Sequence, residues 1–224
     1  MTRLFAAAPR FALFLLAMIP VLIGGGILLS MYQGGLGTFT EPEDIIRRSN
    51  YPWALVGHII GGSAMLILGL TQLSARLRRA APGLHRWTGR LLVLAGGVFA
   101  LAGLRMNASS TAQDDSFLYD AAQNVMAVLF VAILALGIVA IRQRRIAAHR
   151  AWMMRAYAIT LGTAAQTIML LPVFLLFGPP TGLIADLAFI SGWVVTLSVA
   201  EVLIRRGQTR QPPLPISNIL GHRS

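Results

Sequence analysis

The sequence predicts an all-α protein, a six-transmembrane helical bundle within a lipid bilayer. Of its 224 residues, 56% are hydrophobic and 12% are charged, and the mean hydropathy is +0.68. An ordinary soluble domain has about 25% charged residues, so this composition excludes a soluble globular protein. Six apolar windows are each long enough, as helices, to cross a hydrocarbon core of about 30 Å.

The predicted spans cover residues 11–31, 51–73, 89–106, 121–141, 152–177 and 183–204. The short connections between them predict a single helical domain over residues 1–206. The remaining residues, 207–224, contain several prolines and polar residues, which predicts a disordered cytoplasmic tail.

The first span follows Arg3 and Arg10, a pattern that signal peptides and membrane helices share. Its apolar run, residues 11–31, is longer than the roughly 7 to 15 residues of a signal-peptide core. We therefore expect this segment to be retained as a transmembrane helix.

The second span carries small and polar residues on one helical face. The face consists of His58, Gly62, Met65, Gly69 and Gln72, which are spaced by four, three, four and three residues. His58 and Gln72 on such a face fit a quinone site or a proton route. The same face equally fits a packing seam, in which Gly57 and Gly61 bring a neighbouring helix close.

The third span presents glycines below a histidine at its entrance. His85, Gly89, Gly96 and Gly103 follow one another at intervals of four, seven and seven residues, again on one face. Glycine leaves room there for a flat group, either another helix or the edge of a porphyrin or quinone ring. Gly89 and Gly96 are therefore candidate cofactor contacts.

The fourth span contains no histidine, and Asn124 is its nearest polar residue at the outer depth. The fifth span is preceded by His149, which is followed by Trp152 much as His85 is followed by Trp87. Because odd-numbered spans start on the same side of the membrane, we expect the two histidines at a similar depth. They could bind a metal ion between them, or they could cap helices and contact lipid phosphates.

Charged residues inside the fifth and sixth spans are expected to pair, because an unpaired charge at this depth costs several kcal/mol. Arg155 and Glu201 lie at matching inner depth, and Asp186 has Arg105 as its expected partner near the outer side. Arg155 also suits the carboxylate of a haem propionate.

Arginine is distributed unevenly between the two sides of the predicted bundle. The side that holds both chain ends carries 16 arginines, whereas Arg47, Arg48 and Arg105 lie on the other side. By the positive-inside rule, both termini are expected in the cytoplasm. Topology thereby explains the net charge of +11, and no nucleic-acid partner is expected.

Residue types that are missing exclude several classes of chemistry. The chain has no cysteine and no lysine, so disulfides, thiolate metal sites, iron–sulfur clusters and Schiff bases are excluded. It also has no H-E-x-x-H and no G-x-S-x-G motif, so a membrane hydrolase is not indicated and no catalytic residue is assigned.

Short motifs recur at the entrances of the spans. They are Gly57-His58, Thr71-Gln72, Leu84-His85-Arg86 with Gly89-Arg90, and His149-Arg150 with Trp152-Met153 and Arg155. With these motifs the chain resembles a family of bacterial multi-pass membrane proteins of unknown function, over roughly residues 51–170. The resemblance implies a location in the bacterial cytoplasmic (inner) membrane and no established activity.

The histidines are also similar to those of transmembrane diheme b-type cytochromes, which carry haem ligands on four successive core helices. His58, His85 and His149 correspond to the second, third and fifth of these helices, while the fourth span lacks its histidine. This resemblance implies an inner haem b with His85 and His149 as axial ligands.

The leading hypothesis is therefore a b-type haem- or quinone-binding electron-transfer protein. His85 and His149 would bind the metal, and the other predicted cofactor contacts are His58, Gln72, Gly89, Gly96 and Arg155. Its partners would be the lipid bilayer and a quinone or a redox protein. The alternative is a non-catalytic membrane component, such as an assembly partner of a respiratory complex or a small-molecule transporter.

Overall fold

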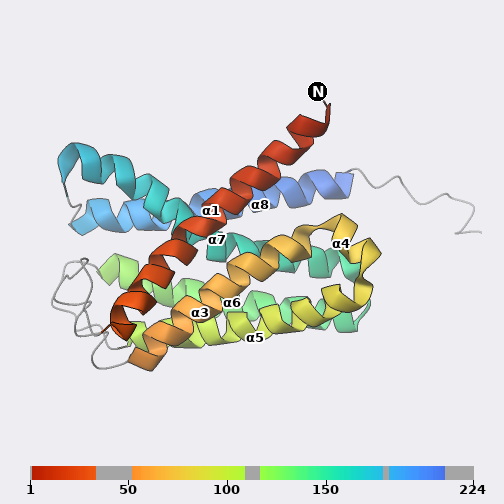
Figure 1. Cartoon of the computed structure of the whole chain (residues 1–224), viewed down its shortest axis with the longest axis horizontal. Coiled ribbons are helices and arrows are strands. Elements are labelled where there is room, and N and C mark those ends of the chain that lie inside the picture. Colours follow the sequence, from red (N-terminus) through yellow and green to blue (C-terminus); the bar gives the residue numbers. More distant parts are fainter. Residues whose placement is uncertain (1, 34–51, 109–116, 179–181, 210–224) are drawn as a thin grey trace, which may run out of the picture.

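The computed structural model describes residues 2–33, 52–108, 117–178 and 182–209 (Figure 1). These residues form helices, and they contain no strand. The helices are α1 (Thr2–Tyr32), α3 (Pro52–Leu73), α4 (Ala75–Ala80), α5 (Pro82–Asn107), α6 (Phe117–Arg142), α7 (Ile146–Phe177) and α8 (Gly182–Thr209). All of them except α4 are long and apolar enough to cross a membrane, which confirms the predicted all-α class with six candidate spans.

Several helices begin earlier than the apolar windows predict, and for α5 and α7 this changes where the histidines lie. Helix α5 starts at Pro82 and α7 starts at Ile146, so His85 and His149 lie in the first turns of spanning helices rather than in loops. Proline suits the first helical position because its missing N–H needs no partner there. At the other end of the chain, α8 continues to Thr209. The rest of the predicted disordered tail lies outside the described residues.

Tight turns connect neighbouring helices at one end of the bundle. Ser74 separates α3 from α4 and caps α4, because its Oγ accepts a hydrogen bond from the Leu77 N–H at 3.2 Å. Ala81 alone separates α4 from α5. Helices α6 and α7 are joined through Arg144, whose φ of 60° lies in the left-handed region. Helices α3 and α5, like α6 and α7, are therefore close antiparallel neighbours.

The most extensive helix pairs are α7 with α8, α3 with α5, and α6 with α7. Helix α1 crosses α3 obliquely and also contacts α7. Figure 1 shows the start of α1 and the end of α8 on the same side of the molecule as α4. This arrangement agrees with an even number of spans; which side faces the cytoplasm stays a prediction from the positive-inside rule.

Helix α7 is the centre of the bundle, and most of its residues from 156 to 166 are buried. Its small residues admit large side chains from neighbouring helices. At Gly162, a Cβ atom would lie only 2.1 Å from Cδ1 of Trp193, and at Gly69 of α3 it would lie 2.2 Å from Cε2 of Tyr157. Glycine is thus required at both positions by close packing.

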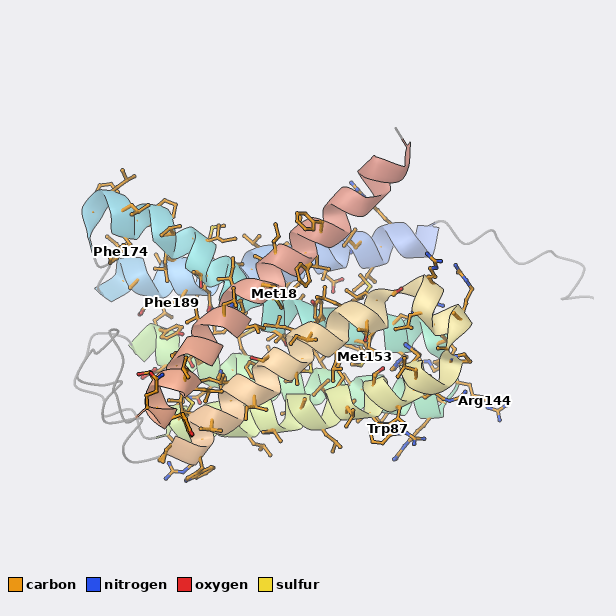
Figure 2. All side chains as sticks on the ribbon, viewed as in Figure 1. Met18, Trp87, Arg144, Met153, Phe174 and Phe189 are labelled. Carbon is orange, nitrogen blue, oxygen red and sulfur yellow. The ribbon has the colours of Figure 1, made fainter. Side chains whose placement is uncertain are left out.

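The surface of the bundle is apolar along its length. Leu94, Leu101, Val128 and Leu175 are among the many large hydrophobic side chains that remain exposed (Figure 2). Exposing this much apolar surface to water is energetically unfavourable, whereas the hydrocarbon chains of lipids would cover it. The fold therefore supports an integral membrane protein.

Candidate functional site

A cavity of about 110 Å³ lies among α3, α5, α6, α7 and α8. It is in the half of the bundle remote from α4, because its lining includes residues near the start of α3, the end of α5 and the start of α6. Its polar lining residues are His58, Asn107, Gln123, Asn124, Thr163 and Gln166. Its aromatic lining residues are Phe99, Tyr119, Phe130 and Trp193. A mostly apolar cavity with a few converging polar groups is typical of a small-molecule site.

His58 is held against α5 by two contacts. Its Nδ1 lies 3.1 Å from the backbone oxygen of Phe99, and its ring stacks on the Phe99 ring with centroids 4.3 Å apart. A carbonyl oxygen only accepts hydrogen bonds, so Nδ1 carries the proton and Nε2 of the neutral ring is left as an acceptor. Gly103 allows His58 to occupy this position, because a Cβ atom at residue 103 would lie only 3.1 Å from Nδ1 of His58.

Gln166 of α7 is a deeply buried polar residue of the cavity lining. Its exposed fraction is 5%, and no described residue accepts a hydrogen bond from its Nε2. Gly192 of α8 makes room for it, because a Cβ atom there would lie 2.6 Å from Cγ of Gln166. An unsatisfied buried donor costs about 1–3 kcal/mol, so this amide is a costly polar group within the lining of the cavity.

Flat aromatic rings surround the polar groups. Tyr119 stacks on Phe189 with centroids 4.5 Å apart and lies nearly parallel to Trp193 at 6.4 Å. Phe99 meets Phe130 edge to face at 5.7 Å. Offset-stacked and edge-to-face geometries are those that aromatic pairs prefer, so these rings form a packed aromatic wall.

A buried carboxylate lies on α8, outside the set of residues that line the cavity. Asp186 is 3% exposed, and its spacing of three and seven residues from Phe189 and Trp193 places all three on one side of α8. Within the described segments, neither a hydrogen bond nor an ion pair joins Asp186 to Arg105. The predicted pairing of these two residues is therefore not found.

The second histidine region lies at the opposite end of the bundle. His85 and His149 are close enough to interact electrostatically, which agrees with the prediction that they share a depth. Nδ1 of His149 donates to the backbone oxygen of Gly137 at 2.9 Å. Nδ1 of His85 is buried and has no hydrogen-bond partner among the residues that the structure describes.

Gln72 links α3 to the start of α5 and does not line the cavity. Its Nε2 donates to Oγ1 of Thr88 at 2.5 Å and to the backbone oxygen of His85 at 3.3 Å. Gly89 packs against it, since a Cβ atom at Gly89 would lie 3.4 Å from Oε1 of Gln72. The polar end of the predicted face is thus a contact between helices.

Gly96 lies where side chains of two other helices meet α5. A Cβ atom there would lie 2.9 Å from Cδ1 of Leu134 and 3.2 Å from Sδ of Met65. These side chains occupy the space that the edge of a porphyrin would need. The described residues also contain no group of three or more His, Cys, Asp or Glu arranged for a metal ion.

Arg155 forms the predicted pair with Glu201, which confirms that expectation. Its Nε lies 2.5 Å from Oε1 and its second terminal nitrogen lies 3.1 Å from Oε2, so the contact is bidentate. The guanidinium also lies over the ring of Trp152, 4.7 Å from the centroid. A propionate at Arg155 would have to compete with Glu201.

Of the residues predicted from the sequence, His58 lines the cavity, whereas Gln72, Gly89, Gly96, His85, His149 and Arg155 lie outside it. Sequence reasoning did not assign Trp193, Tyr119 or Gln123 to a site. The glycines offered a signal for the cavity, because Gly103 packs against His58 and Gly192 packs against Gln166.

Comparison with known proteins yields one family. No curated protein and no solved structure matches the chain. The model of the family described as "Predicted membrane protein (DUF2306)" matches residues 55–204, which is well over half of the chain and includes the cavity and both histidine regions. The chain therefore belongs to this family of predicted membrane proteins.

Proposed function

We propose that this integral membrane protein binds a quinone head group in the cavity beside His58 and acts in electron transfer with a redox partner. The observation that carries this proposal is the buried amide of Gln166, which lacks an acceptor among the described residues and borders a cavity with aromatic walls. A quinone is a flat ring whose carbonyl oxygens accept hydrogen bonds. It therefore complements both the donor and the walls.

The cavity also suits the reduced form of such a ligand. Two electrons from the redox partner, together with two protons, would turn the carbonyl oxygens into hydroxyl groups, which donate hydrogen bonds. The Nε2 acceptor of His58 and the amide oxygens of Gln123 and Asn124 are the groups available to receive them. One site can then hold both oxidation states, as an electron carrier requires.

The size of the cavity supports a ring rather than a complete lipid quinone. A volume of about 110 Å³ is on the scale of one unsubstituted ring, so the substituents of a quinone ring would need space beyond the cavity. An isoprenoid tail would extend between the helices into the bilayer, where the exposed surface is apolar. A ligand that dissolves in the membrane reaches such a site without crossing water.

Extraction of the purified protein tests the proposal. Protein solubilised from native membranes is extracted with organic solvent, and quinones are quantified by mass spectrometry. We expect bound quinone in the unaltered protein and at least about tenfold less in the Gln166→Leu variant. Gln143→Leu, the same change at an exposed position outside the cavity, serves as the control. Absence of quinone, or equal amounts in both variants, would falsify the proposal.

A b-type haem held by His85 and His149 is the second candidate, and one observation favours it. The hydrogen bond from Nδ1 of His149 to the Gly137 oxygen is the kind that orients a ligating histidine through its other nitrogen. The packing around Gly96 weighs against it, because Leu134 and Met65 would have to move to admit a porphyrin.

An absorption spectrum separates the two candidates. A Soret band that disappears in both His85→Ala and His149→Ala supports the haem, whereas a featureless visible spectrum removes it. If purified protein contains neither haem nor quinone, a non-catalytic role such as assembly of a respiratory complex is favoured instead.

A further inference from the structure

Arginines from separate helices gather at the end of the bundle that holds α4. Arg76, Arg78 and Arg79 belong to α4, and Arg150 lies in the first turns of α7. Figure 2 shows Trp87 and Arg144 at this same end, far from Phe189 near the cavity. This cluster is therefore distinct from the proposed quinone site.

Arg78 has a fixed position in the cluster. Its terminal nitrogen donates to the backbone oxygen of Gln72 at 3.5 Å, over the last turn of α3. Gln72 is itself fixed by its hydrogen bonds to Thr88 and to the His85 backbone oxygen. The guanidinium of Arg78 thus lies over the C-terminal end of α3, next to the point where Gln72 joins α3 to α5.

The positive charges around Arg78 lack a described counter-charge. Burial, together with the guanidinium charges of Arg150 and Arg79, lowers the pKa of Arg78. Among the carboxylates of the described residues, Glu201 is engaged with Arg155. The other two, Asp120 and Asp186, lie at the opposite end of the bundle, near the starts of α6 and α8. Positive charges that are held close together with no carboxylate to neutralise them favour the binding of an anion.

His85 adds an unsatisfied group to the same place. Its Nδ1 is buried without a hydrogen-bond partner among the described residues, and it interacts electrostatically with Arg78 and His149. An imidazole N–H and several guanidinium groups are together well suited to phosphate oxygens.

We propose that Arg78, Arg79 and Arg150, with His85, form a binding site for the phosphate of an anionic phospholipid. The surroundings favour a lipid over free phosphate: Leu84, Trp87 and Ile146 are large apolar side chains exposed beside the cluster. They provide a surface for acyl chains, and Trp87 is typical of the membrane interface. Basic sites between helices at this depth are known to bind lipid head groups.

Native mass spectrometry of the detergent-purified chain tests this site. The protein is titrated with short-chain phosphatidylglycerol, with short-chain phosphatidylcholine as the neutral reference. We expect Arg150→Gln and Arg78→Gln each to weaken phosphatidylglycerol binding about fivefold. Arg76→Gln is the matched control, because Arg76 lies on the same short helix and carries the same charge. It should change the affinity by less than about twofold.

A second variant and a competition experiment make the outcome decisive. Arg150 is exposed, so its replacement removes charge without disturbing the core if Arg78→Gln fails to fold. Competition with inorganic phosphate distinguishes the source of the phosphate group: a lipid site is not emptied by millimolar phosphate, whereas a free-anion site is. Equal losses in Arg76→Gln and Arg150→Gln, or equal binding of both lipids, would overturn the proposal.

Discussion

Replacement of Gln166 by leucine should make the empty protein more stable while it removes the ligand. The Nε2 atom of Gln166 is buried without a partner among the described residues, at 5% exposure of the residue. Such a donor costs about 1–3 kcal/mol, and leucine has similar length without the polar atoms. For a chain of this size, 1 kcal/mol corresponds to about 2–4 °C in Tm. The expected rise is therefore about 2–12 °C.

The assay is thermal unfolding in detergent, with and without a short-chain ubiquinone analogue. The unaltered protein should gain stability from the analogue, because a ligand that binds only the folded state raises Tm. Gln166→Leu should melt higher than the unaltered protein when empty, and the analogue should no longer raise its Tm. Gln143→Leu, at an exposed position, should behave as the unaltered protein does in both conditions.

The opposite result is equally informative. If Gln166→Leu melts lower than the unaltered protein in the absence of ligand, then the amide already has a satisfied partner, for example an ordered water molecule. The cost assigned to Gln166 would then be wrong. The reasoning that the cavity requires an acceptor from a guest would fail with it.

Two further perturbations have definite expected outcomes. Gly103→Ala should weaken binding of the ubiquinone analogue about threefold or more, because a Cβ atom there would lie 3.1 Å from Nδ1 of His58 and displace its ring. Gly97→Ala is the control and should leave binding unchanged, because nothing lies within 4 Å of a Cβ atom at that position. Arg155→Gln should lower the free energy of unfolding by about 1 kcal/mol. Adding Glu201→Gln should restore part of this loss, which a double-mutant cycle measured by thermal unfolding would detect.

The spans were predictable because the free energy of burying an apolar helix in lipid depends on length and composition, which the sequence states directly. The pairing of Arg155 with Glu201 was predictable for a related reason: charges at equal depth have few other partners. His58 stood out in the sequence because a polar group within an apolar span must find either a partner or a ligand, and the structure places it in the cavity lining.

What the sequence did not reveal depends on helix rotation and on side chains from distant segments. A glycine face such as that of Gly96 has the same appearance whether a porphyrin or the side chains of Met65 and Leu134 fill it. Likewise, Gln166 and Trp193 meet only because α8 packs along α7 with Gly192 against Gln166. The starts of α5 and α7 were misplaced because polar residues continue these helices beyond the apolar windows.

The cavity lies away from the short turns that join neighbouring helices. Helix α6 passes into α7 through residues 143–145, at the same end of the bundle as α4. Both α5 and α6 contribute walls to the cavity in the opposite half of the bundle. Because the chain has no cysteine, a pair of cysteines introduced beside the cavity, one in α5 and one in α6, would be its only thiols and would cross-link these two walls without side reactions.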